Sequence, residues 1–141
     1  MLHRWIEGHA VQRIALRDGL VLNLDDYNQL VISGSLRLTL PPAELHPAEQ
    51  VLIDPRNLSG WQRALLDFAG ATCTRATCAE NGHLHLEFSS GHQIDVGGDA
   101  HRIAWELYGK YRGYAVCLPG GRVRAVRHDL PEDNDTAVVP A

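Results

Sequence analysis

Hydrophobic residues recur at every second position through long stretches of this chain, a period typical of β-strands with one buried face. In LVLNLD the leucines at 20, 22 and 24 share one face, and the preceding RIAL joins them if residues 17–19 form a hairpin loop with Gly19 at positive φ. The alternation continues to Leu40 and is interrupted at Gly34, where a bulge or bend is expected. Three antiparallel strands are therefore predicted between residues 11 and 40.

A single helix is predicted near the middle of the chain. Residues 41–57 carry four prolines and little periodicity, so we expect a long connection with a short extended piece at 50–53. After it, Ser59 and Gln62 have the spacing of a capping box, and Gly70 stands where a C-terminal cap belongs. The apolar residues between them recur at helical spacing: Trp61, Ala64, Leu65 and Phe68. We predict a helix over 59–70 with this stripe against a sheet.

Strand patterns return after the helix, in residues 71–79 and then in HLHLEF, HQIDV, AWELYG, YAVCLP and RVRAV. The SSG loop at 89–91 pairs HLHLEF with HQIDV. Residues 119–121, Pro-Gly-Gly, close the last hairpin, for which we expect the side chains of Tyr114, Val116 and Leu118 on the face of Val123 and Ala125. The predicted fold class is α+β: a twisted, mainly antiparallel sheet of about eight strands in meander hairpins, packed on one helix.

Length and charge define the expected organisation. The chain of 141 residues fits a single domain over residues 1–128, followed by an acidic, flexible tail over 129–141. The net charge of -4 comes from that tail, and the scattered arginines form no basic patch, so no nucleic-acid partner is expected. No apolar run approaches the roughly 18 residues of a membrane span and no signal-peptide core is visible, which predicts a cytoplasmic protein without a membrane partner. Three cysteines do not form a disulfide framework, and reduced thiols are expected.

The most suggestive chemical pattern is a pair of histidines on one strand. Alternation places His83, His85 and Glu87 on the face opposite the leucines of HLHLEF, and the SSG loop sets His85 across from Asp95. Such residues can bind zinc or another divalent ion, so His83, His85 and Asp95 are candidate ligands. His92 or His101 would be an additional ligand. The alternative is an ordinary solvated face with histidine–carboxylate pairs and no cofactor.

Other residues are candidates for contacts with a partner or an anion. The alternation of AWELYG turns Tyr108 outward, where with Arg112 it could anchor a partner, because tyrosine and arginine are enriched at binding hot spots. Arg122 and Arg124 share a strand face and could contact an anion. The same register sets Cys117 opposite Arg124, which would lower the pKa of its thiol. No residues with a catalytic motif are found, so the enzyme class is not favoured.

The C-terminal half carries a resemblance to a known kind of protein. AWELYG followed by GYAVCLPGGRVRAV is similar to the C-terminal signature of a family of small, functionally uncharacterised actinobacterial proteins. The IDP turn at 53–55, LLDFAG at 65–70 and LHLEFSSGHQIDV agree with it. The resemblance implies no activity, ligand or catalytic residue. In size and architecture the chain also resembles immunity proteins of bacterial toxin systems.

The sequence therefore favours a non-enzymatic interaction module that binds a protein partner, or a second copy of itself, through a sheet face or a strand edge. The open alternatives are a divalent-metal-binding protein or small metal-dependent enzyme, and a small-molecule binder with a pocket between helix and sheet.

Overall fold

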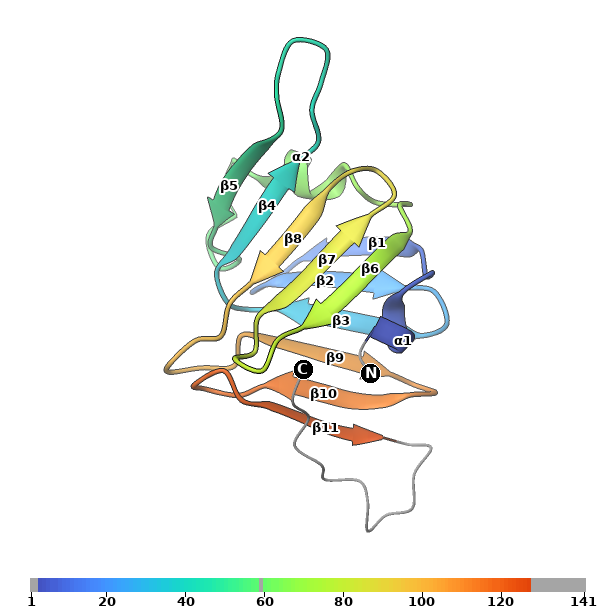
Figure 1. Cartoon of the computed structure of the whole chain (residues 1–141), viewed down its shortest axis with the longest axis vertical. Coiled ribbons are helices and arrows are strands. Elements are labelled where there is room, and N and C mark those ends of the chain that lie inside the picture. Colours follow the sequence, from blue (N-terminus) through green and yellow to red (C-terminus); the bar gives the residue numbers. More distant parts are fainter. Residues whose placement is uncertain (1–2, 59, 128–141) are drawn as a thin grey trace.

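Two antiparallel sheets form the body of the molecule (Figure 1). The computed structural model describes residues 3–58 and 60–127, and within them are eleven strands and two short helices. The six-stranded sheet has the order β1 (Val11–Leu16), β2 (Leu20–Leu24), β3 (Asn28–Ile32), β9 (Trp105–Gly109), β10 (Gly113–Cys117), β11 (Val123–Arg127). The five-stranded sheet has the order β5 (Glu49–Ile53), β4 (Leu36–Leu40), β8 (Gln93–Val96), β7 (Leu84–Phe88), β6 (Cys73–Cys78). The helices are α1 (His3–Ile6) and α2 (Gln62–Leu66).

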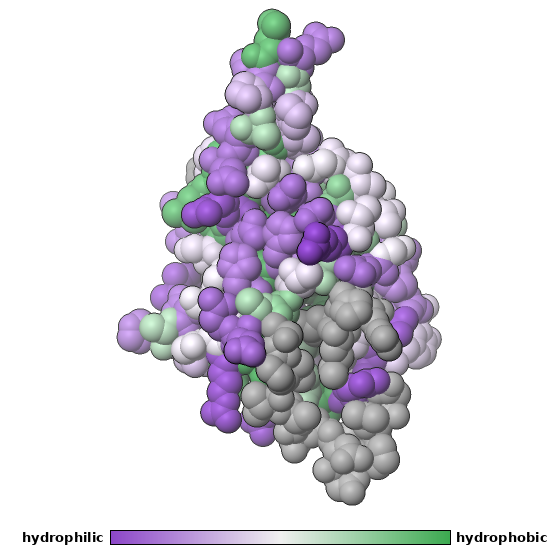
Figure 2. Space-filling model, viewed as in Figure 1, coloured by the Kyte–Doolittle hydropathy of each residue, from purple (hydrophilic) through white to green (hydrophobic). Residues whose placement is uncertain are grey.

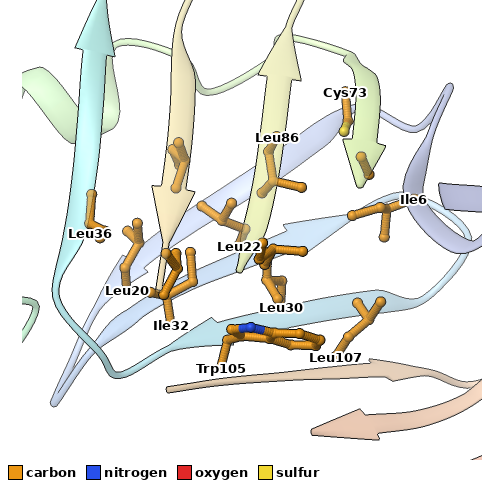
Figure 3. Close-up of a cluster of buried hydrophobic side chains, with 14 of the residues drawn as sticks. Ile6, Leu20, Leu22, Leu30, Ile32, Leu36, Cys73, Leu86, Trp105 and Leu107 are labelled. Carbon is orange, nitrogen blue, oxygen red and sulfur yellow. The ribbon is translucent and has the colours of Figure 1, made fainter. Parts of the chain in front are cut away.

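The hydrophobic core lies between the two sheets. Every second residue of the central strands points inward and is almost fully buried, as the burial pattern of β2 and of β7 shows. Figure 3 shows leucines of β2 and β3 facing Leu36 and Leu86 of the other sheet, with Trp105 beside them. Burying one such side chain contributes about 1.5–3 kcal/mol to the free energy of unfolding, so the facing sheets supply the main driving force for this fold.

This arrangement corrects the predicted fold class. A mainly antiparallel architecture is confirmed, but the protein is largely β rather than α+β. The described residues form eleven strands in two sheets, not about eight in one, and the leucine-rich faces pack on the second sheet instead of on a helix. Helix α2 has only five residues and contacts β1. The predicted capping box is not formed as expected, since the N-cap is Trp61 and Gln62 Oε1 accepts a hydrogen bond from the Gly60 amide. Leu65 and Phe68 are buried, as the apolar stripe predicted.

Gly34 marks the place where the chain changes sheets. It follows β3 of the six-stranded sheet and precedes β4 of the five-stranded sheet, so the predicted interruption is a corner between layers rather than a bulge in one strand. Its amide donates to the Ala104 carbonyl at 2.8 Å, and a Cβ at this position would lie 3.1 Å from the Ala104 Cβ. The crossing therefore depends on a residue without a side chain.

No helix among the described residues is long and apolar enough to cross a membrane. Helix α1 contacts β6 and helix α2 contacts β1. The predicted acidic tail, residues 129–141, lies outside the described residues.

Candidate functional site

The predicted histidine pair lies on the outer face of the five-stranded sheet, where the register sets His85 directly opposite Asp95 as expected. His85 Nδ1 lies 2.7 Å from Asp95 Oδ1, and His83 Nε2 lies 2.9 Å from the same oxygen. His85 Nε2 lies 2.8 Å from Glu87 Oε2. The structure thus brings the predicted residues together into a hydrogen-bonded cluster, the histidine–carboxylate cluster, defined by His83, His85, Glu87 and Asp95.

The cluster favours the charged form of His85. Burial works against that form, but the hydrogen bonds to Glu87 and Asp95 outweigh it, so the pKa of His85 is raised above its ordinary value. Burial would likewise raise the pKa of Asp95, but hydrogen bonds from both histidines outweigh it and lower that pKa. As an imidazolium, His85 donates from both ring nitrogens to carboxylates.

The metal ligand set is not assembled in full. No group of three or more His, Cys, Asp or Glu side chains within residues 3–58 and 60–127 is arranged to hold an ion. His92 faces the interior, where it is 7% exposed and its ring contacts Phe68, so it is on the wrong face to be the additional ligand. The backbone amide of His101 bonds the Asp99 carboxylate in a loop after β8. Zinc binding by His83, His85 and Asp95 stays a prediction.

The cluster predicts a pH-dependent stability. Because the pKa of His85 is raised on folding, its contribution is fully present below its unfolded pKa of about 6.5 and is lost as the pH rises through its folded pKa. We expect His85→Gln to lower the free energy of unfolding by about 0.5–1 kcal/mol near pH 5.5 and by less above pH 8. Urea titrations at both pH values measure the difference. His101→Gln is the control, and an equal effect of His85→Gln at both pH values would contradict this expectation.

In the β10–β11 hairpin, the observed register differs by one residue from the predicted register. Its loop holds Pro119, Gly120 and Gly121, with the Leu118 amide bonded to the Arg122 carbonyl at 2.7 Å. Val116 therefore pairs with Arg124, and Cys117 pairs with Val123. A shift of one residue moves every side chain to the other face. The inward face consequently carries Ala115, Cys117, Val123 and Ala125, not Tyr114, Val116 and Leu118.

Cys117 is a buried structural residue. Its side chain is fully buried, and burial raises the pKa of its thiol, the opposite of the predicted lowering. Arg122 and Arg124 are both exposed, as predicted. Arg122 lies in the turn at the opposite end of β10 from Arg112, so the structure does not bring these arginines into one site with Arg112. Their contact with an anion stays a prediction.

Exposed aromatic residues gather at the end of the six-stranded sheet that holds the β2–β3 and β9–β10 turns. The tyrosine surface consists of Tyr27, Tyr108, Tyr111 and Lys110. The exposed fractions of its tyrosines are 67%, 47% and 55% in that order. Lys110 Nζ lies 4.9 Å from the ring centroid of Tyr27 and 5.6 Å from that of Tyr111, and the two rings meet edge to face at 5.7 Å.

Two turns hold this surface in place. In the β2–β3 turn, Asp26 and Tyr27 have φ values of 60° and 59°, the left-handed conformation that tight hairpins with the sheet's twist require. This conformation costs of order 1 kcal/mol in a residue such as tyrosine. The Lys110 amide donates to the Tyr27 carbonyl at 3.1 Å and so ties the β9–β10 turn to it. Arg112 adds an ion pair with Asp26 at 3.6 Å.

A shallow hollow of about 600 Å³ adjoins the tyrosine surface. Its lining includes Gln12, Asn23, Asn28, Gln29, Tyr108 and Lys110. Gln29 Nε2 donates to Asn23 Oδ1 at 3.2 Å, and the buried Asn28 donates to the Asp25 carbonyl at 3.1 Å. Tyr108 and Arg112 were predicted from the sequence as partner contacts, whereas Tyr27 was not. The signal for Tyr27 was the DDYN segment between two strand patterns, which is the position of a tight turn.

The two outer faces therefore differ in character. Over β7 and β8 the surface is mainly hydrophilic (Figure 2), while the opposite sheet presents the tyrosine surface at one end. Fold and surface together define a two-layer antiparallel β-sandwich with an aromatic patch on one outer face. A comparison with protein families matches residues 2–127 to a family of unknown function, DUF6188, and the chain belongs to that family. Comparisons with curated proteins and with solved structures gave no match.

Proposed function

We propose that this protein is a non-enzymatic binding module that recognises a protein partner through the tyrosine surface. The observation that carries the proposal is the contact of Lys110 with the rings of Tyr27 and Tyr111, beside a hollow that Tyr108 also lines. Each of the three tyrosines is about half exposed or more. Tyrosine offers a large contact area at a low cost in side-chain entropy, and for this reason it is enriched at binding hot spots.

The order of the tyrosine surface in the free protein supports the proposed binding function. Tyr27 and Lys110 sit on turns that are joined by a backbone hydrogen bond, and the edge-to-face contact with Tyr111 restricts two rings at once. A surface that is ordered before binding loses less entropy when the partner docks. Tyr27 combines a strained φ with an exposed side chain, and residues in strained backbone conformations cluster at binding and active sites.

The positively charged residues at the tyrosine surface indicate what kind of partner it would bind. Lys110 belongs to the surface, and Arg112, which pairs with Asp26 at 3.6 Å, borders it. A partner segment with acidic side chains beside apolar ones would match this pattern. A toxin neutralised by the module, as in immunity systems, is one form that such a partner can take.

The two alternative functions, metal binding and small-molecule binding, have less structural support than the tyrosine surface. Metal binding by His83, His85 and Asp95 draws support from the two imidazole nitrogens that face one carboxylate oxygen, but both nitrogens already have that hydrogen-bond partner. A small-molecule site draws support from the hollow beside Tyr108, which is wide and shallow. Metal analysis of the purified protein distinguishes the first alternative, since a stoichiometric ion that is lost in His85→Ala would establish it.

The proposal is tested by position-specific photo-crosslinking. Tyr27→benzoylphenylalanine and Tyr108→benzoylphenylalanine should each give the same discrete protein adduct in cells that naturally express the chain. Arg75→benzoylphenylalanine, on the exposed face of β6, is the control and should give none. Adducts from the Arg75 position only, or from none of the three, would contradict the proposal.

Binding of the captured partner should depend on Tyr108. A hot-spot tyrosine contributes about 2 kcal/mol or more, so Tyr108→Ser should weaken the affinity by roughly 30-fold or more. Calorimetry with both purified proteins measures this change. Arg75→Ser is the matched control, and a Tyr108→Ser complex as tight as the wild-type complex would exclude the tyrosine surface as the binding site.

A further inference from the structure

The connection between β4 and β5 projects from the body as an arm, residues 41–48 (Figure 1). Ala43 and His46 pair across it in an isolated bridge. At its tip Leu45 is 90% exposed, and Figure 2 shows hydrophobic atoms at this end of the molecule. Three prolines, at positions 41, 42 and 47, stiffen the arm. An apolar side chain is thus carried on a stiff support well away from the core.

The arm leads directly into β5, the edge strand of the five-stranded sheet. Among the described strands only β4 pairs with β5, and Leu52 on its outer face is 71% exposed. Apart from Glu49 at its start, the strand EQVLI has no charged residue and no proline, the residues that usually protect an exposed edge. Its backbone groups are therefore available to another strand.

The opposite edge of the same sheet is closed. The Ala76 amide of β6 donates to the Glu7 carboxylate at 2.8 Å. Further along, the Gly8 amide donates to the Cys73 carbonyl at 2.7 Å, and the Cys73 amide donates to the His9 carbonyl at 2.9 Å. The N-terminal segment thus covers β6, and the chain leaves β5 as the uncovered edge of this sheet within the described residues.

We infer that a second copy of the chain covers this edge, with β5 pairing antiparallel to its counterpart about a two-fold axis at Val51. In this arrangement the arm of each copy runs past the end of the other copy's β5. Leu45 lies six residues before Val51, about 20 Å from the axis, whereas Ile53 lies only about 7 Å from it. The tip of the arm therefore reaches beyond Ile53, to the residues that follow β5.

A matching hollow lies at that place. It has a volume of about 300 Å³ and is lined by Leu16, Asp18, Pro55, Arg56, Leu58 and Gln62. Leu16 and Leu58 supply apolar surface for the leucine of the other copy. In the proposed dimer Arg56, which lies 3.7 Å from Asp54 in its own chain, would also meet Glu44, the neighbour of Leu45 in the arm. Because a two-fold axis repeats each contact, both arms and both hollows are occupied at once.

Sedimentation equilibrium of the full chain over a range of concentrations tests this inference. The wild type should form a dimer, and the double variant Leu45→Ser, Leu52→Ser should dissociate with a constant at least tenfold higher. Both leucines are exposed, so this variant should fold with an unchanged circular dichroism spectrum. Leu66→Ser, at a leucine that is 45% exposed outside the edge, is the control and should dimerise like the wild type.

Disulfide crosslinking tests the register in which the two β5 strands pair. Val51→Cys should form an intermolecular disulfide on mild oxidation, because residues at a two-fold axis face each other within the range of a disulfide. Thr74→Cys, exposed on the closed edge β6, should not. A monomer at all concentrations, a dimer unaffected by the double variant, or crosslinking at Thr74 instead of Val51 would each overturn the inference.

Discussion

Replacing Trp105 by alanine should lower the free energy of unfolding by about 3–5 kcal/mol, because the change leaves a large cavity between the sheets. The side chain is fully buried beside leucines of β3 and β9 (Figure 3). Its Nε1 also donates to the Gly82 carbonyl at 2.9 Å, so the variant deprives a buried acceptor of its partner. Urea denaturation monitored by circular dichroism measures the loss.

Trp105→Phe separates the effect of the cavity from the effect of the lost hydrogen bond to Gly82. It keeps most of the ring volume but removes the donor to Gly82, and we expect a loss of about 1–2 kcal/mol. If Trp105→Ala cost less than about 1 kcal/mol, the indole would not fill the space between two packed sheets, and the described core would be wrong.

Phe68→Asp should be the other strongly destabilising change, with a loss of more than about 4 kcal/mol or failure to fold. Phe68 is fully buried and stacks on Phe88 of the five-stranded sheet with ring centroids 4.9 Å apart, so the variant buries a carboxylate without a partner. Thermal and urea unfolding measure the loss.

Leu66→Asp, at the last residue of α2, is the matched control two residues before Phe68. Leu66 is 45% exposed, so the new carboxylate remains hydrated and stability should change by only about 0.5 kcal/mol. Equal destabilisation by the two aspartates would contradict the burial of Phe68 and the exposure of Leu66.

The local hairpins could be predicted from the sequence. The three-residue loop at Arg17–Gly19 and the SSG loop gave the registers Leu16 with Leu20 and His85 with Asp95, both confirmed. In these hairpins the loop residues and the alternation of apolar side chains fix the same register independently. The histidine–carboxylate cluster was predictable for this reason, because one hairpin holds all four of its residues.

The second sheet could not be predicted in this way. Alternation shows that one face of a strand is buried, but it does not identify what covers that face. Leu30 and Leu38 have the same pattern, yet they belong to different sheets on either side of the Gly34 corner. The error at the β10–β11 hairpin has a similar origin. Pro-Gly-Gly allows loops of different length, and β10 is nearly apolar on both faces.

The tyrosine surface depends on contacts between distant parts of the chain. Tyr27 and Tyr111 meet because β3 pairs with β9, and the sequence offers no local signal for that pairing. The DDYN segment indicates a tight turn, but the positive φ of Tyr27 is uncommon for an aromatic residue, so the segment alone does not predict where its side chain lies. Tyr108, in contrast, was placed outward correctly by alternation alone.

Hydrogen–deuterium exchange of the complex with the captured partner tests the central claim most directly. We predict slower exchange in the two turns that carry the tyrosine surface, residues 26–29 and 108–112, relative to the free protein. Exchange over His83 and His85 should stay unchanged. Slower exchange confined to the histidine–carboxylate cluster, with no change in either tyrosine turn, would show that the partner binds elsewhere.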